Sequence, residues 1–262
     1  MARLGAWSAL PNSVALEALA RSGADFVGLD AQHGAYDFRD LVQAIQLLDL
    51  LAVESLVRIY ELELELIPRV LDFGASGVIV AMVEDPETVR RAVALTRYQP
   101  GGIRSYGGRR YGLSPEPDEL PDVRPAVHVM IETRQALDRL EEIAAVPGLT
   151  GLFFGPVDLA LALGVTGPLA RRLSEELAGE SPLDTPAAAD TDEGKAAGAW
   201  RDACLRLVRV AHEHGLEAGT FARGGADARY WATAGFDRVF VASDIALLRA
   251  ALERELRIAG GG

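Results

Sequence analysis

The chain has 262 residues, of which 49% are hydrophobic and 6% aromatic, and its formal net charge at pH 7 is −12. This length supplies an ample core, and the acidity argues against nucleic acid or an anionic membrane as a partner. The single cysteine, Cys204, excludes an intrachain disulfide and is expected to be buried on a helix. No signal-peptide core and no apolar run of ~20 residues occurs, so we expect a cytoplasmic protein.

Segments typical of strands and helices alternate along the whole chain. Strands are predicted at residues 3–10, 25–30, 55–60, 77–83, 126–132, 150–155, 216–222 and 237–243. Each is followed by a predicted helix, at residues 12–23, 37–51, 64–76, 85–98, 133–148, 200–215, 225–235 and 244–258. Asn12 or Ser13 and Asp85 are the expected N-caps of the first and fourth helices, and Pro68 should interrupt the third.

Eight strand–helix pairs in a chain of this size predict an α/β fold, the (β/α)8 or TIM barrel. A doubly wound parallel sheet is the alternative, but it usually has fewer pairs, and no glycine-rich phosphate turn follows the first strand. Two segments break the alternation. One is the Gly/Pro-rich loop 99–124, and the other is the acidic, low-complexity stretch 164–198, in which residues 169–178 are a candidate short helix. We therefore predict one barrel domain, residues 1–262, with a flexible insertion at 164–198.

Side chains of opposite parity face opposite sides of a strand, which separates the strand 126–132 into two sets. Val127, Val129 and Ile131 form an aliphatic set suited to packing under helices. His128, Met130 and Glu132 form the set that faces the barrel lumen. Glu132 is therefore predicted as an inward carboxylate at the C-terminal end of its strand.

Further polar residues fall at the same rim. Alternation turns Arg58 and Asp30 inward, and Gln32 and His33 follow Asp30 in the loop above it. Asp158 is expected on the loop after the strand that ends at Gly155. The C-terminal rim is where barrel enzymes carry out their chemistry.

The residue types at this rim indicate metal-assisted enolate chemistry. The carboxylate pair Glu132 and Asp158 suits a hard divalent ion such as Mg²⁺ or Mn²⁺ better than zinc. Arg58 would stabilise an oxyanion, and His33 has a pKa suited to proton transfer near neutral pH. A 2-oxo acid chelated by the ion could then form a stabilised enolate. The alternative is structural, because Glu132 and Asp158 each precede an apolar run and could simply cap a helix.

Several of these segments resemble the HpcH/HpaI family of class II pyruvate aldolases, which includes 4-hydroxy-2-oxoheptanedioate aldolase and 2-dehydro-3-deoxyglucarate aldolase. The most specific segment is "IETRQALDRLEEIAAVPGLTGLFFGPVDLALALG", and the others are "GADFVGLDAQHG", "LVRI", "VLDFGASGVIVAMVEDPETVRRAVALTRYQPGGIRS" and "GFDRVFVASD". The resemblance implies a lyase that reversibly cleaves a 4-hydroxy-2-oxo acid to pyruvate, or a close 2-oxo acid, and an aldehyde.

The resemblance also implies roles for individual residues. The metal ligands are Glu132 and Asp158, which would hold Mg²⁺ or Mn²⁺, with Co²⁺ as a further candidate. His33 is the general base and acid, and Arg58 holds the keto oxygen. The pyruvate carboxylate is received by backbone N–H groups near Gly155, Val157 and Asp158, and Phe221 lies near the aldehyde.

The resemblance makes Asp72 the aspartate that is coupled to the histidine. Because Asp72 lies between a helix and the next strand, it belongs to the opposite face of its own barrel, so a contact with a neighbouring subunit or a structural role stays open. Asp30 is better placed to orient His33. The family forms homohexamers by exchanging C-terminal helices, and residues 244–258 are apolar enough for that role.

Two departures from the family keep other functions open. Gln32 stands where a glutamate often precedes the histidine, and Met130 stands where glutamine is frequent. The first removes a contact for water or metal, and the second makes the pocket floor more apolar. The alternatives are a carbon–carbon lyase acting on a CoA thioester, of the citryl-CoA or malyl-CoA type, and a barrel that binds a 2-oxo acid without turnover.

Overall fold

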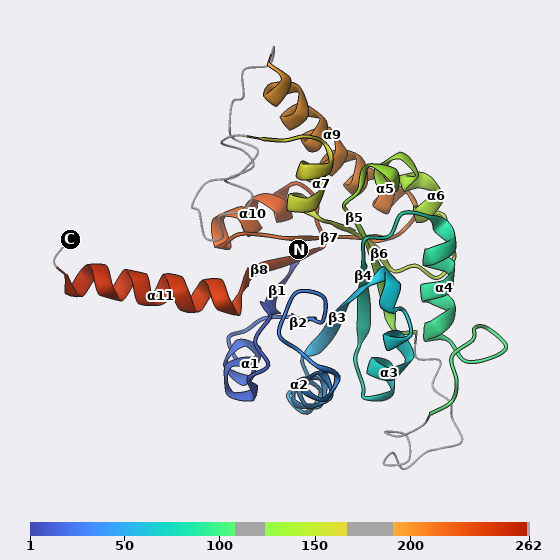
Figure 1. Ribbon diagram of the computed structural model, residues 1–262, viewed down its shortest axis with the longest axis horizontal. Coiled ribbons are helices and arrows are strands. Elements are labelled where there is room, and N and C mark those ends of the chain that lie inside the picture. The colour runs from blue at the N-terminus through green and yellow to red at the C-terminus, as the bar shows by residue number, and fades with distance from the viewer. Residues whose placement is uncertain (108–123, 167–190, 261–262) are drawn as a thin grey trace.

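Eight parallel strands form the centre of the molecule in a computed structural model that describes residues 1–107, 124–166 and 191–260 (Figure 1). Each strand pairs with the next, and the last pairs with the first, so the sheet is a closed barrel. The strands are β1 Arg3–Ser8, β2 Phe26–Asp30, β3 Glu54–Tyr60, β4 Gly77–Ala81, β5 Ala126–Ile131, β6 Gly151–Phe154, β7 Glu217–Phe221 and β8 Arg238–Ser243. This closure confirms the predicted (β/α)8 barrel and excludes the doubly wound sheet.

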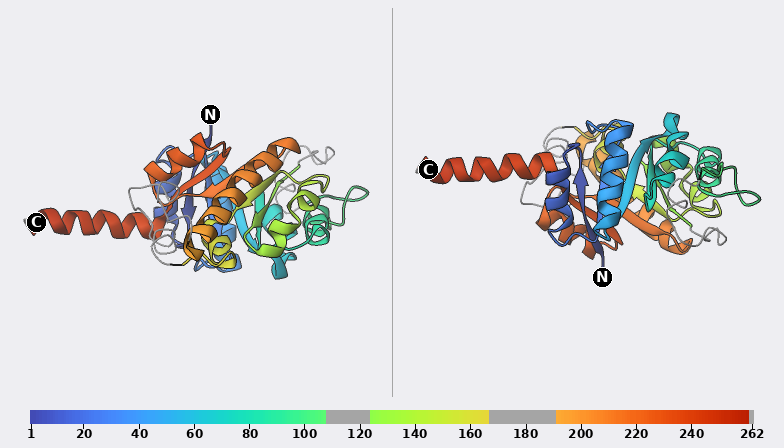
Figure 2. Two further views of the ribbon diagram at one scale, coloured as in Figure 1. Left: turned by 90° about the horizontal axis from the view of Figure 1, so that it is seen from above. Right: turned by 90° about the horizontal axis from the view of Figure 1, so that it is seen from below.

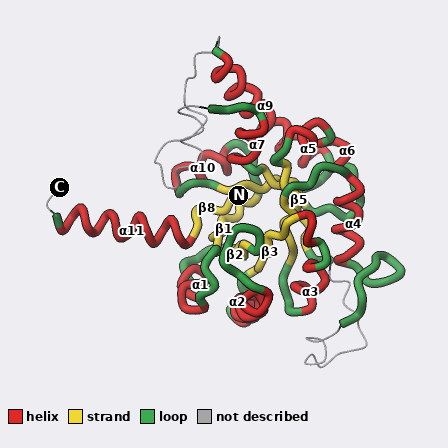
Figure 3. Tube along the Cα trace, viewed as in Figure 1, coloured by secondary structure: helices red, strands yellow, loops and turns green. Residues whose placement is uncertain are grey.

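Helices surround the barrel (Figure 3). They are α1 Ser13–Ala20, α2 Phe38–Leu50, α3 Leu66–Asp72, α4 Pro86–Thr96, α5 Arg134–Asp138, α6 Leu140–Ala144, α7 Pro156–Ala162, α9 Asp192–Glu213, α10 Gly225–Thr233 and α11 Asp244–Ala259, with a short 3-10 helix at Glu61–Glu63. Asn12 caps α1 and Asp85 caps α4, as predicted. Within the described ranges, no helix is long and apolar enough to cross a membrane.

Three helices differ from the prediction. Pro68 does not interrupt a helix, because α3 begins only at Leu66 and the proline lies in its first turn, where no N–H partner is lost. The predicted helix 133–148 is two short helices that meet at Arg139. α9 begins at Asp192, inside the predicted insertion 164–198, and the candidate helix 169–178 lies outside the described residues.

Strand residues of alternating parity build two apolar layers. Val127, Val129 and Ile131 pack against helices, as predicted, in the layer outside the barrel. The lumen is filled by a second cluster that consists of Trp7, Phe26, Leu56, Ile79, Ala81, Met130, Phe153 and Phe240. The cavity described below therefore lies above a packed floor.

Charged residues close the lumen at the end where the strands begin. Arg238 contacts Glu54 and Glu217 at 2.6 Å each, and Arg3 contacts Glu54 at 2.7 Å. His128 Nε2 lies 3.0 Å from the Glu217 carboxylate. Because this network occupies the N-terminal end, the open end of the barrel is the one where the strands finish.

The C-terminal helix α11 extends away from the barrel (Figure 2). Apolar side chains are exposed along it, namely Ile245, Leu247, Leu248, Leu252, Leu256 and Ile258. Exposed aliphatic groups in this number along one helix are typical of an interaction surface.

Candidate functional site

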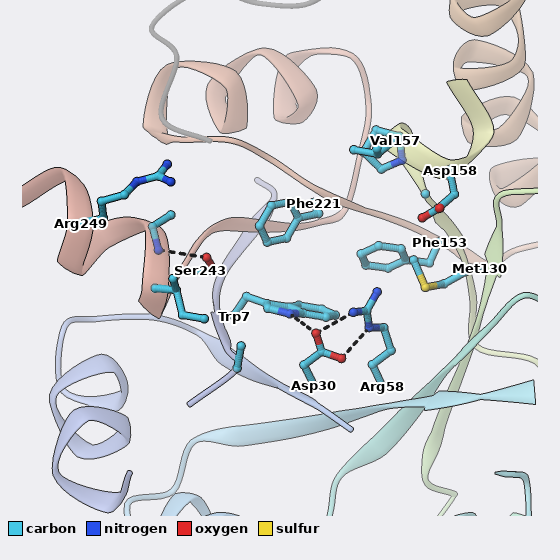
Figure 4. Close-up of a pocket in the computed structure, with 15 residues that line it drawn as sticks. Trp7, Asp30, Arg58, Met130, Phe153, Val157, Asp158, Phe221, Ser243 and Arg249 are labelled. Atoms are coloured by element: carbon cyan, nitrogen blue, oxygen red, sulfur yellow. Dashed lines mark hydrogen bonds and ion pairs between the residues drawn. The ribbon is translucent and has the colours of Figure 1, made fainter. Parts of the chain in front are cut away.

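A cavity of about 370 Å³ lies at the C-terminal ends of the strands (Figure 4). Strand ends and loops supply part of its wall, and the starts of α7 and α11 supply the rest. Its lining residues are Trp7, Ala9, Asp30, Arg58, Met130, Phe153, Gly155, Pro156, Val157, Asp158, Phe221, Ser243, Ile245, Ala246 and Arg249. Seven residues that sequence reasoning placed at the site are therefore brought together, namely Asp30, Arg58, Met130, Gly155, Val157, Asp158 and Phe221.

Arg58 is held in the cavity wall by Asp30 and Trp7. Its Nε and Nη2 donate to the two Asp30 carboxylate oxygens at 2.9 and 2.6 Å, a two-point pair that fixes the plane of the guanidinium. The guanidinium carbon lies 5.0 Å from the centre of the Trp7 ring, and the indole N–H donates to Asp30 at 3.2 Å. The remaining guanidinium donors are available to a ligand in the cavity.

Asp30 remains ionised despite its burial. Burial raises the pKa of its carboxyl, but the hydrogen bonds and the charge of Arg58, with help from the His33 amide and Trp7, outweigh that effect and lower the pKa. Asp30 Oδ1 also accepts the backbone N–H groups of Gln32 at 3.1 Å and His33 at 3.0 Å. The contact between Asp30 and His33 is thus made through the backbone, and the role of Asp30 in orienting the imidazole stays a prediction.

His33 lies on the exposed loop above Asp30 and is not among the residues that line the cavity. Within the described part of the chain, its imidazole has no hydrogen-bonding partner. The Gln32 side-chain oxygen is buried and likewise has no hydrogen-bond partner among the described residues. Both side chains therefore have donor or acceptor capacity left for a ligand or water.

Glu132 lies directly behind Gly155, as a buried carboxylate at the end of β5. Its Oε1 accepts the backbone N–H of Met82 at 2.7 Å, and Met82 adopts a left-handed backbone, with φ of 58°, to present that N–H. A Cβ at position 155 would lie 2.6 Å from both Cβ and Oε2 of Glu132. Only glycine leaves room for this carboxylate. Glu132 does not cap a helix, because Thr133 caps α5.

Asp158 lies in the first turn of α7, whereas the sequence predicted that it would lie on a loop. Its charge contributes to the unusual electrostatics of Glu132. Burial, opposed by the Met82 N–H and reinforced by Asp158, raises the pKa of Glu132 to about 7. Two neighbouring carboxylates with oxygen donors only are the kind of ligand set that a hard divalent ion prefers. No group of three or more His, Cys, Asp or Glu side chains in the described ranges could hold a metal, so the remaining positions would fall to water and substrate.

Apolar residues form the other walls of the cavity. Met130 and Phe153 lie at its floor, and Phe221 packs edge-on to Trp7 with ring centres 5.8 Å apart. The predicted apolar floor at Met130 is therefore confirmed. Phe221 contributes to the cavity wall and to lumen packing at once.

Asp72 lies elsewhere, at the end of α3 on the face where the strands begin. It pairs with Arg104 at 2.7 Å, and the Arg104 side chain is buried against Tyr98. The structure therefore does not bring Asp72 to His33 of the same chain, because the turn between α3 and β4 lies at the opposite end of the barrel.

Sequence reasoning missed several residues that line the cavity, and it missed Met82, which does not line the cavity but donates its N–H to Glu132. Trp7 carried a usable signal, because it stands near the end of a predicted strand that leads to the rim. Met82 had none, since a left-handed methionine cannot be recognised from its neighbours. Arg249 was hidden in a helix that was interpreted only as an apolar surface. It lies at the edge of the cavity away from Asp158 (Figure 4).

A closed (β/α)8 barrel with a cavity at the C-terminal ends of its strands has the arrangement typical of barrel enzymes. The sequence model of the HpcH/HpaI aldolase/citrate lyase family matches residues 3–174, and the chain belongs to this family. It is accordingly a carbon–carbon lyase of the class II pyruvate aldolase type, which confirms the sequence prediction.

Named relatives agree with this assignment. The chain is similar to hydroxypyruvate/pyruvate aldolase of Rhizorhabdus wittichii, with 34% identity over 250 residues that cover 95% of this chain and 90% of that protein. It is 31% identical over 256 residues to 5-keto-4-deoxy-D-glucarate aldolase of Klebsiella pneumoniae subsp. pneumoniae, covering 96% and 90%. The crystal structure of an HpcH/HpaI aldolase/citrate lyase family protein from Burkholderia cenocepacia superposes with a TM-score of 0.80 at 28% identity, covering 98% and 94%.

Proposed function

We propose that the protein cleaves a 4-hydroxy-2-oxo acid reversibly into pyruvate and an aldehyde, with Arg58, His33 and the Glu132–Asp158 pair as its working groups. The proposal depends mainly on one observation. Asp30 fixes the Arg58 guanidinium in the wall of the cavity that Asp158 also lines, and the charges of Arg58 and Asp158 both act on the buried Glu132 carboxylate. The similarity to a hydroxypyruvate/pyruvate aldolase supports pyruvate as the 2-oxo product.

Glu132 and Asp158 would hold a divalent ion, Mg²⁺ or Mn²⁺, which supplies Lewis-acid polarisation of the 2-oxo group when bound. The Met82 N–H and the clearance at Gly155 keep the Glu132 carboxylate in place for this role. Among the described residues, no histidine or cysteine lines the cavity, and this lack of nitrogen and sulfur ligands favours Mg²⁺ or Mn²⁺ over zinc.

Arg58 stabilises the negative charge that develops on the oxygen of C2. Its orientation is set before substrate arrives, so little reorganisation is needed during the reaction. The substrate carboxylate is received at the start of α7, where Val157 and Asp158 present backbone N–H groups and no side-chain cap competes for them. The N–H of Gly155 is already directed at the Ile131 carbonyl, at 3.4 Å.

His33 accepts the proton of the 4-hydroxyl group. The C3–C4 bond then breaks, the aldehyde leaves, and the bonding electrons pass into the enolate of pyruvate. Return of a proton to C3 completes pyruvate. His33 serves both steps because an imidazole exchanges protons readily near neutral pH.

Exchange of pyruvate methyl protons with D2O in the presence of Mg²⁺ or Mn²⁺ tests this proposal without knowledge of the aldehyde. His33→Ala should slow the exchange by about 100-fold or more, the usual contribution of a general base. His214→Ala is the matched control, since His214 is an exposed histidine at the end of α9. Pyruvate binding without metal-dependent exchange would instead identify a binding protein and refute catalysis.

We also propose that α11 docks on a neighbouring subunit in a homohexamer. Its leucines remain exposed in the part of the chain that the structure describes, at 60% for Leu252 and 61% for Leu256. Light scattering of Leu252→Asp should show a smaller assembly than the wild type. Leu50→Asp changes a leucine on α2 that is 80% exposed and should leave the mass unchanged. A monomeric wild-type protein would refute the proposal.

A further inference from the structure

Three buried polar side chains at the edge of the cavity form one hydrogen-bonded chain. They are Ser8 at the end of β1, Tyr36 in the loop between β2 and α2, and Asp244 at the start of α11. Ser8 Oγ lies 2.7 Å from the Tyr36 hydroxyl and 2.9 Å from Asp244 Oδ2. Their exposed fractions are 0%, 9% and 4%, so water competes little for these bonds.

Chemistry fixes the direction of the chain. The Asp244 carboxylate only accepts, so Ser8 donates its single proton to Asp244 and its oxygen accepts from Tyr36. Burial, opposed by the Ser8 hydrogen bond and reinforced by the charge of Asp244, raises the pKa of Tyr36 to about 12. Tyr36 therefore keeps the proton that it donates.

Asp244 is the fixed end of this chain. Besides Ser8, it accepts the backbone N–H groups of Ala9 at 3.1 Å, Leu10 at 3.0 Å and Ile245 at 2.8 Å. One carboxylate thus immobilises the segment after β1 and the first turn of α11. Tyr36 is bound to a rigid point of the barrel.

The loop that carries His33 is hydrogen-bonded to the barrel at several points. Near its start, Asp30 accepts the His33 N–H, and further along, the N–H of Ala35 donates to the Ala9 carbonyl at 2.9 Å. A Cβ at Gly34 would collide with the carbonyl oxygens of Asp30 and Ala9, which shows how closely the loop lies on β1. Beyond Gly34, Tyr36 supplies the side-chain anchor through Ser8.

We infer that Tyr36 and Ser8 are positioning residues that hold the His33 loop against the cavity through Asp244. This inference rests on the proposed role of His33 in proton transfer. His33 itself is exposed and unbonded among the described residues, so its place over the cavity depends on the backbone that carries it. The Tyr36 hydroxyl is not a cavity-lining group and does not contact the substrate site.

Tyr36→Phe tests the inference by removing one oxygen atom. Misplacement of a catalytic group by about 1 Å can cost up to about 100-fold in rate, so we expect the maximal rate of pyruvate deuterium exchange to fall by about 10-fold to 100-fold. KM for pyruvate should change less than about 2-fold, because Arg58 and α7 are untouched. Tyr230→Phe, which removes a hydroxyl from a half-buried tyrosine on α10, is the matched control and should keep the wild-type rate.

Amide hydrogen exchange supplies a second readout that does not require activity. Residues 31–37 should exchange faster in Tyr36→Phe and in Ser8→Ala than in the wild type, while the amides of β5 stay protected. Unchanged exchange rates and unchanged maximal rate in both variants would overturn the inference. If His33→Ala keeps full activity, the proposed function fails instead, and faster amide exchange in Tyr36→Phe would still show that the hydroxyl anchors the loop.

Discussion

A single methyl group added at Gly155 should displace Glu132 from Asp158, the other predicted metal ligand. In Gly155→Ala the new Cβ would lie 2.6 Å from Cβ and Oε2 of Glu132. A Cβ essentially never lies this close to an atom to which it is not bonded, so one side must move. Glu132 Cβ is attached to the backbone next to β5, and Oε1 is held by the Met82 N–H. The carboxylate is therefore the part that is displaced.

The expected magnitude follows from these contacts. Extra volume in a packed site costs typically ~1–3 kcal/mol, and loss of a hydrogen bond to a charged group costs ~1.5–3 kcal/mol. Disturbing the groups that orient a metal ligand lowers metal affinity by typically about 10-fold to 100-fold. We expect Gly155→Ala to show both effects, a lower melting temperature and a larger dissociation constant for Mn²⁺.

Calorimetric titration with Mn²⁺ and thermal unfolding without metal measure the two effects separately. Gly198→Ala is the matched control, because Gly198 lies in α9 with nothing within 4 Å of an added Cβ. That substitution should stabilise the helix by ~0.5–1 kcal/mol and leave Mn²⁺ binding unchanged. Wild-type Mn²⁺ affinity in Gly155→Ala would show that Glu132 does not bind the ion in the position seen here.

Three further predictions concern other parts of the chain. Burial raises the pKa of Glu217, but His128 and Arg238 outweigh it and lower the pKa to about 2. The ionised Glu217 carboxylate therefore stabilises the fold fully above its ordinary pKa of 4.5, and this stabilisation is lost as the pH falls towards 2. The difference in unfolding free energy between the wild type and Glu217→Gln should accordingly become smaller between pH 4.5 and pH 2. A difference that stays constant over this range would contradict the network. Arg249→Ala should lower kcat/KM by about 5-fold for aldehydes with a terminal carboxylate and leave neutral aldehydes unaffected, because an ion pair with an exposed side chain contributes at most about 1 kcal/mol. Equal losses for both kinds of aldehyde would contradict a charge-based contact. Burial raises the pKa of Cys204 to about 12, so a thiol reagent should react only with unfolded protein, and rapid labelling of the native chain would show that the helix opens.

The barrel could be predicted because its signals are local. Eight apolar runs, each followed by an amphipathic segment, leave a closed parallel sheet as the simplest arrangement. Strand parity then placed Arg58 and Asp30 in the lumen without any three-dimensional information, and the pairing of β2 with β3 puts these two residues side by side in register. Parity could be applied here because successive side chains face the lumen and the helices in turn along β2 and β3.

Other features of the site depend on contacts between distant segments, which no local pattern reveals. Asp158 is the exception, because its helix α7 carries a local signal: Pro156 stands at the first helical position, where proline is favoured. The remaining features have no such signal. The left-handed backbone of Met82 is imposed by Glu132, fifty residues later in the chain. The link between Tyr36 and Asp244 spans most of the sequence. In each case the local sequence permits several conformations, and the tertiary partner selects one.

The buried strand β2 can end in the charged residue Asp30 because donors surround its carboxylate. Its two oxygens receive the guanidinium of Arg58, the indole N–H of Trp7 and the backbone amides of Gln32 and His33. Arg58, which is proposed to stabilise the enolate, and the loop of His33, which is proposed to transfer protons, are thus both hydrogen-bonded to the Asp30 carboxylate. A buried charge without partners would be costly, but here each donor offsets part of the desolvation. The same bonds that keep Asp30 ionised therefore tie the Arg58 side chain and the His33 backbone to one point, and a hydrophobic replacement could satisfy the packing but not those bonds.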